Sequence, residues 1–514
     1  RHFPFLLSFH FTDSFDFMKI FAKWKHCWVI FENKMATNRS EREPLIIVIL
    51  GCTGTGKSKL SLEIGKRIRG EIISADSMQV YKGLDIITNK VTSEERASVP
   101  HHLLDFVEAS EKFSVVEFQT IALEAIWDIL ARQKVPIIVG GTNYYIESLL
   151  WENLIDERKG SQEESGENIS KFLKLENEER PETDHTRELN TKSVESLDSL
   201  QNLSQTQSET KDVESLVGRN QPSPCDDVET PNFLHQQLAK VDSTMAQKLH
   251  PNDTRKIKRS LEVYERSGIS HSEHIAHQQS QEGSCEYGGP MRFKNVCVLW
   301  IRCEFETLDK RLDARVDQMI DQGLVYELIE FHNSWKHEPN NTKMQNNEGI
   351  FQSIGFKEFR EFLSPGNTQV EENPVMFQKC VDAMKCATRR YARKQVRWVN
   401  NRFLGRPSTS SPDVYSLDAT DLGHWEQNVL EQALSIVESF RSGKKVPLEP
   451  LERIITSAAA KRSNHKCTEC NDRVIIGDQN WEAHLRSRSH RHYKKKQQRF
   501  QEGCTRELRS TITF

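Results

Sequence analysis

A glycine-rich stretch that ends in lysine and serine is the first part of the sequence whose residue types could carry out chemistry. Residues 51–58 read Gly-Cys-Thr-Gly-Thr-Gly-Lys-Ser and match the pattern G-x-x-x-x-G-K-[ST]. Glycines let such a loop curl until its N–H groups surround phosphate oxygens at the start of a helix, while the lysine adds positive charge and the serine can ligate Mg²⁺. The residues expected to bind phosphate are Gly51, Thr53, Gly54, Thr55, Gly56, Lys57 and Ser58.

A carboxylate follows this loop closely in the chain. Asp76 is the first acidic residue after the short strand predicted at 71–74. A P-loop ATPase or kinase normally has an acidic residue after a later strand to hold its metal ion, but the apolar run 135–139 is followed by two glycines and Thr142. Thr142 indicates a hydroxyl donor rather than a metal ligand. The residues alone leave two roles open for Asp76, a metal ligand or a general base.

Two cysteines and two histidines near the C-terminus have the spacing of a zinc finger. Two residues separate Cys467 from Cys470, and His484 and His490 follow in the same short segment. Two thiolates and two imidazoles can complete a tetrahedral Zn²⁺ site. His492 is an alternative last ligand. Basic residues surround the motif, so the finger is predicted to bind RNA, with protein contact or a nuclear-localisation role as the alternatives.

A densely basic helical stretch is predicted at about 376–404. Phosphates supply affinity for cationic side chains, and aromatic faces can stack on an unstacked base. Tyr391 and Trp398 are the interleaved aromatic residues. The alternative is a solvated basic helix whose aromatic residues belong to the core. The basic residues are Lys385, Arg389, Arg390, Arg393, Lys394, Arg397 and Arg402.

The elements that must position these residues follow an α/β pattern. The apolar runs 45–50 and 135–139 are typical of strands buried on both faces of a parallel sheet, and 71–74 and 295–303 give two more strands. Helical periodicity separates them, for example at 118–130. Strands alternating with helices predict a P-loop-type parallel sheet with helices on both faces.

Charge is distributed unevenly over the 514 residues. The formal net charge is only −4, yet residues 157–230 hold 18 acidic and 9 basic residues, whereas residues 453–514 hold 14 basic and 6 acidic ones. The acidic segment has too few apolar residues to compensate for ordering entropy, which predicts disorder. Eleven scattered cysteines indicate a reducing compartment, and no apolar run is long enough to cross a membrane.

These patterns divide the chain into seven parts. Residues 1–44 are expected to be an extension that is disordered or not translated. The remaining parts are the first part of the catalytic core at 45–151, an insertion region at 152–250, the core continuation with basic helices at 251–404, a C-terminal helical region and linker at 405–460, a matrin-like finger with a basic tail at 461–498, and a tail at 499–514.

Beyond the P-loop, a series of ordered motifs resembles the tRNA dimethylallyltransferases, also called tRNA isopentenyltransferases. The likeness covers about 45–404 apart from the polar insertion, which falls where the family has its helical insertion domain. Similar fingers occur at the C-terminus of eukaryotic members. The motifs lie at 51–58, 75–81, 88–90, 101–105, 140–145, 250–253, 259–264, 315–320 and 353–358, followed by Thr388, Arg389, Tyr391, Arg393, Gln395 and Trp398.

The resemblance implies transfer of a dimethylallyl group from dimethylallyl diphosphate to the exocyclic amine of the adenosine 3′ of the anticodon, tRNA position 37. It implies that the P-loop holds a diphosphate, with Lys256 and Arg259 adding positive charge. Asp76 would be the general base, Thr142 and Lys57 would assist at the diphosphate, and Ser58 would contact Mg²⁺. The residues expected to contact tRNA are Ser77, Gln79, Lys385, Arg389, Arg393, Gln395 and Trp398.

Two other functions remain as alternatives. An adenylate isopentenyltransferase of the cytokinin type shares the core but uses a free nucleotide, which needs neither a basic helix nor a finger. A nucleic-acid-binding P-loop ATPase would use Asp76 to hold metal. For the main interpretation, we expect Mg²⁺ and structural Zn²⁺, the tRNA anticodon stem-loop and dimethylallyl diphosphate as partners, and no membrane. We also expect a cytoplasmic monomer, with a further nuclear or mitochondrial pool as an option.

Overall fold

The computed structural model describes residues 43–152, 231–336, 348–364, 372–454, 464–470 and 473–497. These residues fall into two compact units, one with residues 43–152 and the described residues from 273 to 454, and one with residues 231–272 and the described residues from 464 onward. Most of the expected extension, the acidic segment 157–230 and the tail at 499–514 lie outside the described residues. No helix in the described part of the chain is long and apolar enough to cross a membrane.

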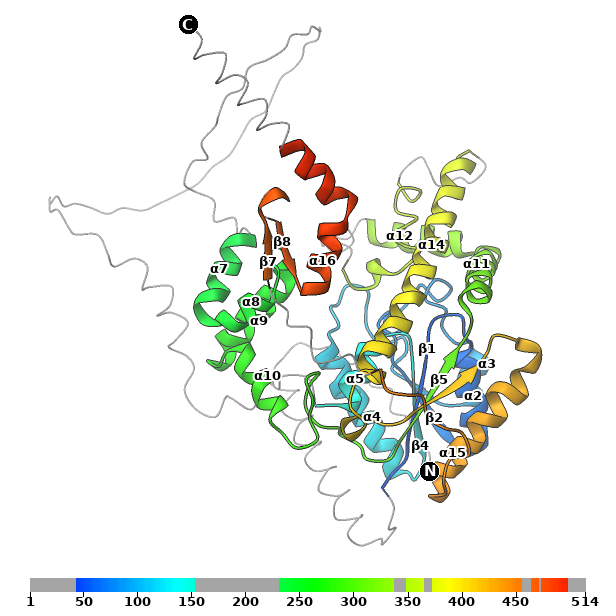
Figure 1. Ribbon diagram of the computed structural model, residues 1–514. Coiled ribbons are helices and arrows are strands. Elements are labelled where there is room, and N and C mark those ends of the chain that lie inside the picture. The colour runs from blue at the N-terminus through cyan, green and yellow to red at the C-terminus, as the bar shows by residue number, and fades with distance from the viewer. Residues whose placement is uncertain are drawn as a thin grey trace, which may run out of the picture. The chain divides into compact units, whose positions relative to one another are not determined.

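A parallel six-stranded sheet forms the first unit, which confirms the predicted P-loop-type core (Figure 1). The strand order is β3-β2-β4-β1-β5-β6. The central strand β1 pairs with β4 and β5, so that Val48 lies opposite Ile138 and Val298. The strands are β1 Ile46–Gly51, β2 Gly70–Ser74, β3 His101–His102, β4 Val135–Val139, β5 Val296–Arg302 and β6 Val414–Asp418.

Both faces of the sheet are covered by helices, as a sheet with apolar residues on both sides requires. Side chains of β1 alternate between two cores, with Val48 in one and Ile47 in the other. Helices α4 (Val115–Ala131) and α5 (Asn143–Leu150) lie on one face, and α2 (Lys57–Ile68), α3 (Ser93–Ser98) and α15 (Gln432–Ser442) on the other (Figure 1). The edge strand β6 was not expected, because five residues within a predicted helical region carry little periodic signal.

A third apolar cluster lies beside the sheet, built around Phe351, Phe356 and Phe359. It joins α11 (Phe305–Asp321), α12 (Leu324–Lys336) and α14 (Pro374–Trp398). The predicted basic stretch at 376–404 is thus confirmed as α14 followed by a π-helical segment. The short 3₁₀ and π segments are Gly349–Gln352, Val399–Leu404, Ser408–Ser410, Leu422–His424, Glu426–Glu431 and Thr468–Cys470.

The second unit combines insertion helices with the finger. The hairpin strands β7 (Asn464–Cys467) and β8 (Arg473–Ile476) precede α16 (Asp478–Arg486). His250 Nε2 donates to the Val474 carbonyl at 3.1 Å, which ties the insertion to the hairpin. The other helices of this unit are α7 Pro231–Val241, α8 Ser243–Lys248 and α9 Thr254–Ser267, whereas α10 His271–Gln279 belongs mostly to the sheet-containing unit. The sheet-containing unit resumes at 273, and the predicted division of the chain at 251 stays a prediction.

Candidate functional site

The glycine-rich loop connects β1 to α2, as the sequence pattern predicts. Gly56, directly before α2, has φ +93°, and a Cβ there would lie 2.7 Å from the Trp425 ring. Only glycine combines this backbone conformation with such a close neighbour. Lys57 Nζ and Thr55 Oγ1 both donate to the Cys52 carbonyl, at 2.8 and 2.9 Å. The loop is therefore closed on itself and preformed.

A cavity of about 220 Å³ opens above this loop within the first unit. It brings the loop together with Asp76 at the end of β2 and the glycine pair at the end of β4, because carboxyl ends of parallel strands meet at one edge of the sheet. Most of the predicted residues of the catalytic core line it. They are Thr53, Gly54, Gly56, Lys57, Ser58, Asp76, Gln79 and Gln395, whereas Gly51, Thr55, Ser77 and Thr142 do not line it.

Asp76 is held in an orientation suited to accept a proton. Its Oδ1 accepts the N–H of Met78 at 2.9 Å, which fixes the carboxylate. Desolvation in the cavity raises the pKa of Asp76, and that backbone hydrogen bond and the charge of Lys57 partly oppose the rise. A carboxylate whose pKa lies closer to neutrality is a better general base at physiological pH. The geometry thus suits the general-base role, and it leaves the metal-ligand role of Asp76 open.

Arg315 completes the positive side of this cavity, and the sequence reasoning assigned it no function. The residue projects from α11 into the same cavity as Lys57 and Asp76. Desolvation lowers the pKa of Arg315, and the charge of Asp76 opposes that shift. Arg315 is the first residue of the motif at 315–320, which carries part of the family resemblance, so the sequence did contain a signal for a functional role. The motif does not indicate that α11 packs beside the P-loop.

Lys57 should make diphosphate binding sensitive to alkaline pH. Desolvation lowers the pKa of Lys57 to about 8, so the ammonium is charged below that pH and loses its proton above it. We expect kcat/KM for a prenyl diphosphate to fall as pH rises through about 8, since this ratio reports groups of the free enzyme. In Lys57→Arg the residual activity should lose this alkaline decline, because guanidinium stays protonated. A decline that persists in the arginine variant would assign it to another group.

The side chains of Thr142 and Ser77 form hydrogen bonds with each other, and neither residue lines the cavity. Thr142 Oγ1 accepts the Ser77 N–H at 3.0 Å and donates to Ser77 Oγ at 3.1 Å. This pair ties the turn that carries Asp76 to the start of α5. Gln79 has a similar task, since its Nε2 donates to the carbonyls of Thr88 and Asn89, both at 3.1 Å. The predicted contacts of these three side chains with substrate stay predictions.

Gln395 connects the P-loop to the end of β4. Its Oε1 accepts the Thr53 N–H at 2.9 Å, and its Nε2 donates to the Gly141 carbonyl at 2.8 Å. The side chain is buried, and a Cβ on Gly141 would lie 2.7 Å from Nε2. Both polar ends of the amide are therefore occupied within the protein. Its predicted contact with tRNA stays a prediction, while the geometry shows a clamp on the loop.

Gln395→Glu should separate these two roles. The carboxylate can still accept the Thr53 N–H but would face the Gly141 carbonyl with a second oxygen, and an unsatisfied buried group costs about 1–3 kcal/mol. We expect KM for the prenyl diphosphate to rise about tenfold while tRNA affinity stays unchanged. Gln378→Ala, at an exposed position of the same helix, is the matched control. Weaker tRNA binding with an unchanged KM for the diphosphate would instead support an RNA contact.

Three of the basic residues predicted to bind tRNA form a ladder of ion pairs between α14 and α11. Lys385 pairs with Asp317 at 2.6 Å and Arg393 pairs with Asp309 at the same distance, with an Arg389–Asp313 pair between them. The ladder fixes the helix that carries Arg315. Trp398 packs against Tyr144, with ring centroids 6.0 Å apart. Arg390, Lys394 and Arg397 of α14 are exposed, as is Lys379, which pairs with Glu361 at 3.3 Å.

The remaining predicted cations, Lys256 and Arg259, lie on α9 in the second unit. Each pairs with an acid three residues away, Lys256 with Asp253 and Arg259 with Glu262. Both keep substantial solvent exposure. Their predicted role at the diphosphate stays a prediction.

The predicted finger residues form a compact cluster in the second unit. Potential ligand atoms of Cys467, Cys470, His484 and His490 all lie within 4.8 Å of one another. His490 Nδ1 lies 3.5 Å from each sulfur and 3.2 Å from His484 Nε2. Zn–S bonds of about 2.3 Å and Zn–N bonds of about 2.0 Å require similar separations, so the donor set fits a tetrahedral zinc ion. The cluster includes His490 and not the alternative His492.

Comparison with known proteins gives a consistent result over most of the chain. A family model described as IPP transferase matches residues 79–214 and 197–402. A tRNA dimethylallyltransferase of Mus musculus is 44% identical, covering 88% of this chain and 86% of that protein, and one of Homo sapiens is 43% identical, covering 90% and 89%. A crystallographic structure of a eukaryotic dimethylallyltransferase acting on tRNA is 28% identical with a TM-score of 0.69, covering 90% of this chain and 100% of that one.

Proposed function

The chain belongs to the IPP transferase family and is a tRNA dimethylallyltransferase, and from this premise we propose how its residues carry out the reaction. The enzyme transfers the dimethylallyl group of dimethylallyl diphosphate to tRNA. The acceptor we propose is the exocyclic amine of the adenosine directly 3′ of the anticodon. The observation that carries this assignment is the single cavity that joins a P-loop, Lys57 and Arg315 to the carboxylate of Asp76.

The P-loop side of the cavity would bind the diphosphate and stabilise its departure. The bond between the allylic carbon and the diphosphate oxygen breaks while negative charge grows on the phosphate oxygens. Lys57 and Arg315 line the cavity together with the loop, so with the N–H groups at the start of α2 they would face the developing charge, and preorganised donors of this kind lower the barrier. Ser58, which lines the cavity, would hold Mg²⁺. That ion would neutralise further charge on the leaving group.

Asp76 would act on the other reactant. The amine nitrogen of the adenosine forms the new bond to the allylic carbon, and the proton it loses passes to the Asp76 carboxylate. The hydrogen bond from the Met78 N–H keeps one carboxylate oxygen in place, which leaves the other for the amine. A target base must leave the stack of the anticodon loop to enter such a cavity.

Binding of the RNA would involve the exposed cations of α14 and the finger. Arg390, Lys394 and Arg397 are exposed, so they can contact phosphates without first losing an ion pair of the α11–α14 ladder. A zinc ion held by the four-residue cluster would fold the finger and present its basic residues. We also propose that the protein is a monomer and that it is located in the cytoplasm.

Labelled dimethylallyl diphosphate tests the function directly. We expect label to be transferred to tRNA and not to AMP. Equal labelling of AMP would indicate an adenylate isopentenyltransferase, and tRNA-stimulated ATP hydrolysis without prenyl transfer would indicate an ATPase. Nucleoside analysis of tRNA from cells that lack the protein, before and after it is restored, would identify the modified base.

A further inference from the structure

One aromatic ring borders the catalytic cavity of the first unit. Among the described residues that line this cavity, Tyr391 of α14 is the only phenylalanine, tyrosine or tryptophan. Gln395, which clamps the P-loop, follows one turn later on the same face of α14, so one helix directs both side chains to the site. None of the reaction steps proposed above uses the ring of Tyr391.

The hydroxyl of Tyr391 is occupied within the protein. It donates to the Gly141 carbonyl at 3.2 Å. Desolvation, together with the nearby charge of Asp76, raises the pKa of Tyr391, so the phenol stays protonated and neutral at physiological pH. Because its proton is committed to a carbonyl, the part of this side chain that remains for a substrate is the ring.

Gly141 brings this ring close to the proposed general base. A Cβ at Gly141 would lie 3.2 Å from Asp76 Oδ2 and 3.7 Å from the Tyr391 hydroxyl, so both groups lie within 4 Å of one point. Oδ2 is the carboxylate oxygen that the Met78 N–H does not hold. The ring therefore borders the space between the P-loop, where the diphosphate would lie, and the carboxylate that would receive the proton of the amine.

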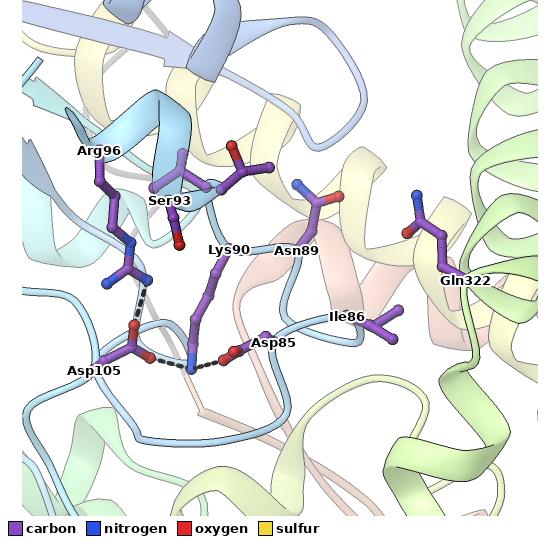
Figure 2. Close-up of a pocket in the computed structure, with 10 residues that line it drawn as sticks. Asp85, Ile86, Asn89, Lys90, Ser93, Arg96, Asp105 and Gln322 are labelled. Carbon is purple, nitrogen blue, oxygen red and sulfur yellow. Dashed lines mark hydrogen bonds and ion pairs between the residues drawn. The ribbon is translucent and has the colours of Figure 1, made fainter. Parts of the chain in front are cut away.

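An adjoining cavity of about 400 Å³ does not suit the dimethylallyl group. Figure 2 shows its wall, in which Lys90 pairs with Asp85 and Asp105, and Asp105 also pairs with Arg96. Paired charges gain nothing from contact with a hydrocarbon, which would strip away their water. The dimethylallyl group, which is joined to the diphosphate at the P-loop, would therefore stay in the catalytic cavity. Apolar side chains in the lining there are Ile72, Val91, Leu104 and Val139 beside the ring of Tyr391.

Prenyl transfer develops positive charge on the group that is moved. The bond from the allylic carbon to the diphosphate oxygen breaks with both electrons going to oxygen, while the amine lone pair forms the new carbon–nitrogen bond and the amine proton passes to Asp76. Where bond breaking runs ahead of bond formation, the dimethylallyl group carries positive charge spread over its allyl system. Lys57 and Arg315 stabilise the departing diphosphate but repel this charge. The face of an aromatic ring attracts a cation within about 6 Å of its centroid, most strongly where water is excluded.

We propose that the ring of Tyr391 stabilises the positive charge on the dimethylallyl group in the transition state of transfer. This makes Tyr391 a catalytic residue that contacts the group being moved. The inference rests on the proposed function, because it requires dimethylallyl diphosphate at the P-loop and the amine of the adenosine at Asp76. Stacking on the extruded adenine is the other task open to an aromatic ring at this place. The two roles differ in their effects on the transfer rate and on tRNA affinity.

Removal of the ring is the first test. Single-turnover rates of dimethylallyl transfer are measured with the full-length protein at saturating diphosphate and tRNA. Tyr391→Phe keeps the ring and should keep most of the rate, whereas Tyr391→Leu should lower it about thirtyfold, the effect of losing a cation–π contact in a dry site. KM for dimethylallyl diphosphate should change little, because the substrate carries no positive charge before the bond breaks. Tyr326→Leu, at an exposed position of α12 outside the cavity, is the matched control and should leave the rate unchanged.

Fluorination of the ring is the sharper test, because it weakens the negative face of the ring with little change of shape. Phenylalanines that carry an increasing number of fluorine atoms are placed at position 391. We expect the logarithm of the single-turnover rate to fall stepwise with each added fluorine, while tRNA affinity stays constant. A ring that only packs against its neighbours or stacks on the adenine would give equal rates along this series.

Equal rates across the fluorinated series would therefore overturn the proposal. So would a Tyr391→Leu variant that loses tRNA affinity and keeps its transfer rate, since that result indicates stacking on the adenine. If Tyr391→Leu does not fold, the fluorinated series decides the question alone, because it keeps a ring at every step. Absence of transfer to tRNA by the unaltered enzyme would instead refute the proposed function.

Discussion

Asp76→Asn is expected to lower the rate of dimethylallyl transfer by about a thousandfold and to leave tRNA binding nearly unchanged. General bases typically contribute about 10²–10⁴-fold to a rate, and asparagine cannot accept the proton of the adenosine amine. The substitution is conservative in shape. An asparagine oxygen can still accept the Met78 N–H, so the turn after β2 should keep its conformation.

The measurement must separate chemistry from binding, because the charge of Asp76 also raises the pKa of Lys57. A neutral residue at position 76 should shift Lys57 toward its uncharged form and weaken diphosphate binding at a given pH. Single-turnover rates at saturating diphosphate, measured below pH 8, remove that contribution. Asp128→Asn, at an exposed position of α4, is the control for a simple loss of charge.

Three results would contradict the general-base role of Asp76. If Asp76→Asn lost tRNA binding as well as the transfer rate, the carboxylate would be needed to organise the site. Recovery of the rate at high Mg²⁺ concentration would indicate a metal ligand, which is the alternative that the sequence left open. A rate that still falls at low pH in the asparagine variant would assign the base to another group.

Cys467→Ser is expected to abolish stoichiometric zinc binding and to raise KM for tRNA about tenfold with a small change in kcat. Structural zinc contributes roughly 10–16 kcal/mol to the folding of small finger domains, so losing one of four ligands should unfold this one. The finger lies in the second unit, and the catalytic cavity is built from residues of the first. Binding should therefore suffer more than chemistry.

Zinc content by metal analysis and the steady-state constants for tRNA are the quantities to measure. Cys386→Ser is the matched control, because Cys386 is a half-buried cysteine outside the cluster. An unchanged KM for tRNA in a zinc-free Cys467 variant would count against an RNA-binding finger and would favour protein contact. A loss of kcat with unchanged KM would show that the finger supports the catalytic unit.

Short patterns of neighbouring residues were sufficient for the P-loop and for the finger. Eight consecutive residues determine the loop, since its geometry depends on glycine conformations and on a strand and helix directly beside it. The four zinc ligands lie within 24 residues, so their spacing alone brings them together. Continuous apolar runs likewise predicted the central strands, because a strand buried on both faces must be apolar at every position.

Side chains far apart in the chain gained their roles through packing. Gln395 lies 342 residues from Thr53 and still holds its N–H, and the ladder between α11 and α14 pairs three cations that looked free. Arg315 enters the cavity only because α11 packs beside the P-loop. Composition and periodicity describe which face of a helix is polar, and they carry no information about which partner that face will meet. The sequence was thus sufficient to predict the P-loop and the finger. The partners of the charged side chains on α11 and α14 depended on long-range contacts.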